Sequence, residues 1–160
     1  MFRINVRKLF GVGTLLLLMP LGVFSQEQPL SVTASIREPE VKVGGKVGIW
    51  LALQNRSDHE LVYMDQAREC DYGVQLRSAE TNLPIPMLPG VREHCSATGG
   101  TTRNITVRIK PGESRRDRIN LEDLFDLSAP GAYTVRVTRQ LPGVTAGPAI
   151  SNDVQFQIIP

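Results

Sequence analysis

Residues 46–54 read KVGIWLALQ, and this stretch decides the fold. Its aliphatic side chains at Val47, Ile49, Leu51 and Leu53 fall on every second position. Successive side chains of a β-strand point to opposite faces, so this period of two predicts a strand with one face on a hydrophobic core.

The same alternation, or a short apolar run, recurs along the chain. It is found in six further segments: residues 31–37, 61–64, 74–77, 104–110, 133–138 and 153–158. Turn residues such as Pro111-Gly112 and Pro130-Gly131 separate most of these segments. Seven short strands divided by such turns predict an all-β fold, an antiparallel sandwich of two sheets.

One short helical turn is expected at residues 120–125. Asn120 is a suitable N-cap, acidic residues follow it in the first turn, and Leu121, Leu124 and Phe125 fall on one face. We expect this turn to close one end of the sandwich.

Residues 126–135, DLSAPGAYTV, resemble the tyrosine corner of immunoglobulin-like domains. The resemblance implies that the hydroxyl of Tyr133 bonds back to upstream backbone. Val135 stands where antibody domains have a cysteine, and Trp50 lies on the second expected strand rather than the third. The resemblance is therefore to the broad immunoglobulin-like β-sandwich superfamily.

The spacing of two proline–glycine turns is similar to that of small bacterial immunoglobulin-like modules, among them the intracellular proteinase inhibitors. Pro111–Ser114 precedes one expected strand, and Pro130–Val135 opens the next. This similarity covers about the last third of the chain and implies the fold rather than an activity.

Residues 1–25 have the pattern of a secretory signal peptide. Arg3, Arg7 and Lys8 precede an apolar run over residues 9–24, which Pro20 interrupts before a small-residue cleavage site. The run is shorter than the roughly 20 apolar residues of a membrane anchor, which is the alternative reading. The sequence thus predicts a leader over 1–25, one domain over 26–160 with no membrane span, and a secreted or periplasmic location.

The charge of the chain changes when the leader is set aside. The chain has 18 basic and 16 acidic residues, and three of the basic ones lie in the leader. The remaining part is close to neutral, which argues against nucleic acid as a partner. The basic residues of 103–118 are interleaved with acids, and we expect them to form a solvated mixed surface.

The two cysteines, Cys70 and Cys95, predict a disulfide in an oxidising compartment. Free or metal-bound thiols are the alternative. The nearby histidines His59 and His94 do not give the paired spacing of a zinc site, so we expect no metal and no cofactor.

No group of residues predicts catalysis. No serine lies in a nucleophile elbow, and the chain has only two histidines, both in turn-like surroundings. We therefore expect a protein that is not an enzyme. Asn55 and Asn104 each begin an N-glycosylation motif, which requires an exposed side chain.

Residues 83–89, LPIPMLP, form the best candidate partner site, with Ile85, Met87, Leu88 and Arg92 as its binding residues. A proline-stiffened apolar loop loses little entropy on binding. In the alternative reading, this segment covers an edge of the sandwich, where proline is tolerated.

The sequence as a whole predicts a secreted, non-catalytic binding module whose partner is another protein. Two alternatives remain. The first is a protease inhibitor that acts through residues 83–89 or 141–148, and the second is a structural component of an envelope assembly.

Overall fold

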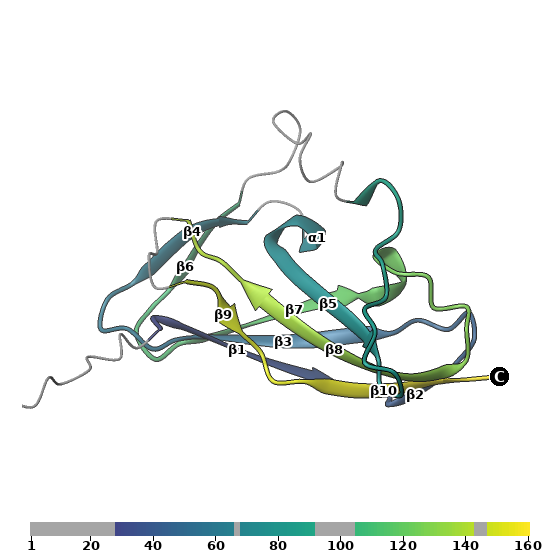
Figure 1. The fold of residues 1–160 in the computed structure, drawn as a ribbon. Coiled ribbons are helices and arrows are strands. Elements are labelled where there is room, and N and C mark those ends of the chain that lie inside the picture. The colour runs from purple at the N-terminus through teal and green to yellow at the C-terminus, as the bar shows by residue number, and fades with distance from the viewer. Residues whose placement is uncertain (1–27, 66–67, 92–104, 143–146) are drawn as a thin grey trace, which may run out of the picture.

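The computed structural model of the chain describes residues 28–65, 68–91, 105–142 and 147–160 (Figure 1). The predicted leader lies outside this part. The elements in chain order are β1 (Leu30–Ile36), β2 (Glu40–Lys42), β3 (Gly48–Asn55), β4 (Leu61–Asp65), α1 (Arg68–Asp71), β5 (Tyr72–Ser78), β6 (Ile105–Ile109), β7 (Ser114–Asn120), η1 (Leu121–Asp123), β8 (Gly131–Arg139), β9 (Ala149–Ile150) and β10 (Val154–Ile159).

The strands form an all-β sandwich, which confirms the predicted fold class. One layer is the ladder β1–β3–β7, and the other is the ladder β2–β10–β8–β5, to which β9 adds through β8 (Figure 1). Two features differ from the prediction. β4 and β6 pair as a separate two-stranded ladder, and β2 runs parallel to β10, whereas the other pairs are antiparallel.

All seven predicted segments form strands, namely β1, β3, β4, β5, β6, β8 and β10. Three further strands were not predicted. β2 and β9 are only three and two residues long, and β7 reads SRRDRIN, whose charged residues hide its alternation.

The core lies between the two larger ladders. In β3 the aliphatic positions Ile49, Leu51 and Leu53 are at most 1% exposed, and Val135 and Val137 of β8 are fully buried in the same hydrophobic cluster. Burying each such side chain contributes about 1.5–3 kcal/mol. The alternation in residues 46–54 therefore builds the centre of the fold.

The predicted helical turn is present as the 3₁₀ helix η1, but its start differs from the prediction. Asn120 makes no capping hydrogen bond with its side chain. Instead, the carboxylate of Glu122 accepts from the backbone N–H of Val47 at 3.1 Å. Leu121, Leu124 and Phe125 are buried, as expected. No helix in the described ranges is long and apolar enough to cross a membrane.

Two sheet edges are closed by groups outside the strands. The side-chain amide of Asn152 accepts from Ala34 N–H at 2.9 Å and donates to Ala34 O at 3.1 Å, as a neighbouring strand would. In the other layer, the edge strand is β5. The backbone of residues 83–85 bonds to this strand, and Ile85 N–H donates to Leu76 O at 2.9 Å. Side pairing of this kind blocks the addition of another strand.

Candidate functional site

Tyr133 lies at the start of β8 in the position that the sequence resemblance implies. Its hydroxyl donates to the carbonyl of Ala129 at 2.8 Å, and its ring stacks on Phe156 with 5.5 Å between ring centroids. The hydrogen bond ties the turn before β8 to the strand, so the role of Tyr133 is structural.

The apolar partner-site candidates lie against the sandwich. Ile85 and Met87 are half-buried and pack on the core, and Leu88 N–H donates to Leu124 O at 2.8 Å. Leu83 is 64% exposed, and the three prolines of the segment, Pro84, Pro86 and Pro89, are exposed as well. Arg92 lies outside the described residues. This placement agrees with the alternative reading, in which residues 83–89 cover an edge.

Cys70 lies in α1 and is not a free cysteine. Cys95 falls outside the described residues, so the Cys70–Cys95 bond stays a prediction. Asn104, in the second N-glycosylation motif, also falls outside them.

Asn55, in the first N-glycosylation motif, is fully buried. Its amide nitrogen donates to the carbonyls of His59 at 2.7 Å and Ile109 at 2.8 Å, and its amide oxygen accepts from Ser57 N–H at 2.9 Å. A sugar chain cannot reach this side chain, so Asn55 serves to fix the turn between β3 and β4.

A buried group of charged side chains lies at the end of the sandwich near β4 and α1. The guanidinium of Arg139, on β8, is 2% exposed. Its Nη2 lies 2.9 Å from Asp65 Oδ1, and its Nη1 lies 3.2 Å from Asp71 Oδ1. The second oxygen of Asp65 pairs with Arg115 Nη2 at 2.6 Å. Two carboxylates thus compensate the buried charge of Arg139.

Two tyrosine rings complete this buried group. The guanidinium carbon of Arg139 lies 5.2 Å from the ring centroid of Tyr63 and 4.8 Å from that of Tyr72. The hydroxyl of Tyr72 donates to Asp117 Oδ2 at 3.2 Å. Burial, and then the negative charge of Asp65, raise the pKa of Tyr63 above its usual value. Burial, and then the charge of Asp117, raise the pKa of Tyr72 further still.

The buried group corrects the expectation for the basic residues of 103–118. That expectation was a solvated mixed surface, but Asp117 is buried and Arg115 is only one-third exposed. Alternate residues of β7 point to opposite sides, so Arg115 and Asp117 face inward while Arg116 and Arg118 face outward. With its charges paired inside the fold, the buried group is suited to holding β4, β7, β8 and α1 together.

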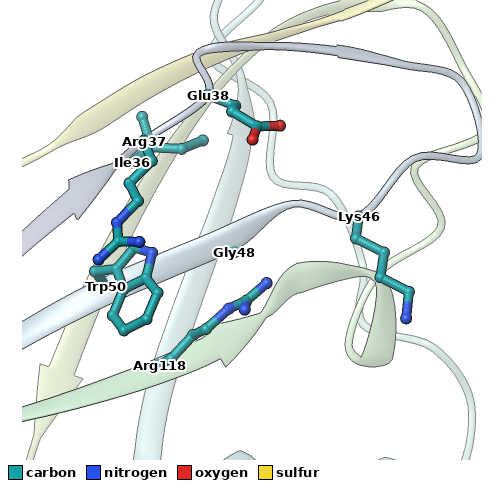
Figure 2. A pocket seen from close by; sticks show the side chains of 7 residues that line it. All are labelled: Ile36, Arg37, Glu38, Lys46, Gly48, Trp50 and Arg118. Carbon is teal, nitrogen blue, oxygen red and sulfur yellow. The ribbon is translucent and has the colours of Figure 1, made fainter.

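A pocket of about 160 Å³ opens on the outer face of the ladder β1–β3–β7, at the end where β1 stops and β3 begins (Figure 2). We call it the Trp50 pocket. Its lining residues come from three strands and their turns: Ile36, Arg37, Glu38, Lys46, Gly48, Trp50 and Arg118.

Two arginines flank the half-buried indole of Trp50. The guanidinium carbon of Arg37 lies 4.1 Å from the indole ring centroid, and that of Arg118 lies 5.4 Å from it. Figure 2 shows Arg37 running down onto the indole, while Arg118 extends from β7 towards Gly48. Cations at these distances are attracted by the face of an indole. Two positive charges therefore lie next to the indole of Trp50 at the opening of the pocket.

The cations of the Trp50 pocket differ from the arginines that form ion pairs elsewhere in the described part of the fold. Arg108 pairs with Glu60 at 2.9 Å and Arg136 with Asp153 at 2.6 Å, whereas Arg37, Lys46 and Arg118 have no ion-pair partner among the described residues. In addition, Arg118 Nε is buried and has no hydrogen-bond partner in the described part of the chain. The pocket is thus positively charged, and one of its donors is unused.

Sequence reasoning placed Trp50 on a strand but did not find this pocket. Trp50 pairs with Arg118 across β3 and β7, and β7 was not predicted. The one sequence feature that could have indicated the pocket was a tryptophan at an outward-facing position of an otherwise aliphatic strand.

Comparisons with known proteins found similarities to solved structures only, and none to a family or to a curated sequence. No protein-family model matches the chain, and no curated protein matches it in sequence. The β-glucosidase EmGH1 from Erythrobacter marinus aligns with 81% of this chain at 11% identity and a TM-score of 0.47. A β-glucosidase from Listeria innocua aligns with 81% of it at 14% identity and a TM-score of 0.45.

This chain spans about one-sixth of the length of those two enzymes, 15% and 16% respectively. PapD-like domain 7 of human CEP192 aligns over 94% of both chains at 13% identity, with a TM-score of 0.30. At these TM-scores the similarities carry no argument about the function of this chain.

Proposed function

We propose that this chain is an exported, non-catalytic interaction module with an immunoglobulin-like β-sandwich fold. Its partner is another protein, which it meets through the outer face of the ladder β1–β3–β7. We call this surface the contact face, and it carries Thr33, Trp50, Ala52, Arg116 and Arg118. Export rests on the leader pattern of residues 1–25.

The observation that carries this proposal is the grouping of Trp50, Arg37 and Arg118 on an open sheet face. Tryptophan and arginine are the residue types that most often dominate the binding energy of protein interfaces. The small side chains of Thr33 and Ala52 lie beside them and are exposed, so a partner can approach the sheet closely.

The chemistry of the Trp50 pocket favours binding over catalysis. A guanidinium keeps its proton at physiological pH, so neither Arg37 nor Arg118 can act as a general base. The pocket has no serine, cysteine or histidine among its lining residues, and the other charged groups that line it, Glu38 and Lys46, can form ion pairs with a partner. The groups present can attract, orient and hold a partner.

Site-specific photo-crosslinking in the native cells tests the proposal. A photo-reactive residue replaces Ala52 on the contact face or, as a matched control, Gln75 on the outer face of the other layer. Both positions are exposed and lie within strands. We expect a polypeptide adduct from position 52 and none from position 75. Equal adducts from both positions, or no adduct from position 52, would contradict the proposal.

A further inference from the structure

We infer that the Trp50 pocket receives an acidic side chain, aspartate or glutamate, of a protein partner. This inference rests on the proposed function and adds the chemistry of the partner's segment. The first argument is charge, since Arg37, Lys46 and Arg118 face a single carboxylate, that of Glu38, around one pocket. A surplus of positive charge without internal partners complements a negatively charged group.

The second argument is the form of the cations. Guanidinium groups are planar and bind carboxylates through two parallel hydrogen bonds. The indole of Trp50 already holds the guanidinium of Arg37 at 4.1 Å, so less side-chain freedom is lost when a ligand binds. A carboxylate that enters between Arg37 and Arg118 meets donors from two sides.

The third argument is the unused donor. Arg118 Nε is already shielded from solvent and makes no hydrogen bond with the described residues. A buried donor without an acceptor is unfavourable, and an incoming carboxylate oxygen would relieve this. This atom distinguishes Arg118 from Arg116, which lies on the same strand and face but does not line the pocket.

The fourth argument is size. A volume of about 160 Å³ is below the 300–1,000 Å³ of typical small-molecule sites. One side chain fits better than a cofactor. The carboxylate of Glu38 on the rim repels a second negative charge nearby, which disfavours densely charged polymers such as nucleic acids.

Trp50 is the only tryptophan of the chain, so its fluorescence reports on the pocket directly. The full chain is titrated with a short peptide that has blocked ends and one glutamate among uncharged residues, and with the same peptide carrying glutamine in place of that glutamate. We expect the glutamate peptide to change the Trp50 emission and the glutamine peptide to bind about tenfold more weakly. Raising NaCl from about 0.05 to about 0.5 M should weaken the glutamate peptide's binding, since screening grows with salt.

Two variants with the same loss of charge locate the binding. We expect Arg118→Gln to weaken binding of the glutamate peptide about tenfold, and Arg77→Gln, at an exposed position on β5 of the other layer, to change it by less than about twofold. Equal effects of the two variants, or equal binding of the two peptides, would overturn the inference. Tighter binding of inorganic phosphate or of oligogalacturonate than of the glutamate peptide would also overturn it, in favour of another class of ligand.

The two proposals fail in different ways. If position 52 crosslinks to a protein but the glutamate peptide does not bind in the pocket, the contact face stands and the acidic ligand is wrong. If position 52 gives no protein adduct, the proposed function itself is wrong.

Discussion

Gly48 lies directly beside the guanidinium of Arg118. A methyl group added at position 48 would come within 2.5 Å of Arg118 Nε and 2.7 Å of its Nη2. The absence of a side chain on β3 therefore lets Arg118 fold back over the sheet. Because the crowded atoms belong to the end of a flexible side chain, the strand itself can accept a larger residue.

We expect Gly48→Ala to displace the Arg118 guanidinium and keep the fold. Alanine relieves the entropic cost of glycine in a strand, about 0.5–1 kcal/mol, so the melting temperature should not fall. The Trp50 emission should change, and the affinity for the glutamate peptide should fall as it does in Arg118→Gln. Gly73→Ala is the control, because its added methyl group meets Thr138 on the other layer. Unchanged peptide affinity in Gly48→Ala would contradict this placement of Arg118.

The buried pair Asp65–Arg139 predicts a large effect on stability. In Asp65→Asn the guanidinium of Arg139 loses a partner at 2.9 Å while it remains only 2% exposed. Breaking a buried ion pair from one side costs about 3–5 kcal/mol, which urea unfolding would measure. The control is Asp153→Asn, which breaks the solvent-exposed pair with Arg136 and should change stability little. If the two variants lost similar amounts of unfolding free energy, the ion pair of Arg139 with Asp65 would not be buried as the structure shows.

The two buried phenols predict loss of stability at high pH. Because the folded protein raises the pKa of Tyr63 and Tyr72, their neutral forms favour the fold below about pH 10, the usual tyrosine pKa. This contribution is lost as the pH rises further. We expect their tyrosinate absorbance to appear together with the loss of strand signal in circular dichroism. Full ionisation of Tyr63 and Tyr72 in a protein that is still folded would contradict this.

The hydroxyl of Tyr133 supports the turn before β8 through its 2.8 Å bond to Ala129 O. We expect Tyr133→Phe to lower the free energy of unfolding by about 1 kcal/mol, because the ring is kept and one hydrogen bond is lost. Thermal unfolding measures the change. A variant as stable as the parent would mean that the ring stacked on Phe156 contributes all of the effect.

The predicted Cys70–Cys95 disulfide would close a loop that includes β5. We expect Cys70→Ser to lower the free energy of unfolding by about 3–4 kcal/mol in the chain-entropy model. Reductant should lower the melting temperature of the parent chain and leave that of the variant unchanged. Equal melting temperatures of the parent with and without reductant would rule the bond out.

The sequence predicted the strands with several alternating aliphatic residues, and it missed the very short β2 and β9 and the charged strand β7. It also did not predict which charged residues of the predicted strands lie inside. In β8 the inward series Tyr133, Val135 and Val137 continues to Arg139, and in β4 the series through Tyr63 continues to Asp65. A strict count of every second residue would have placed both charges inside. Which acid meets which base depends on how two sheets are stacked, and no single strand carries that information.

The candidate site was less predictable than the fold. The Trp50 pocket joins the end of β1, the start of β3 and the outer side of β7, and these meet only through strand register. The segment 83–89 was predicted as a partner site because its residues are hydrophobic. Backbone hydrogen bonds hold this segment against β5, and its side chains Ile85 and Met87 pack on the core, which explains the hydrophobic composition.

The closed edges described above also bear on self-association. The stretch KVGIWLALQ is apolar and rich in strand-forming residues, a composition typical of segments that stack into amyloid. In this fold it occupies the middle strand β3, between β1 and β7. Asn152 occupies backbone groups of β1, and the charged side chains of β7 oppose pairing on the other side. This apolar segment is thereby kept away from other copies of the chain for as long as the sandwich stays folded.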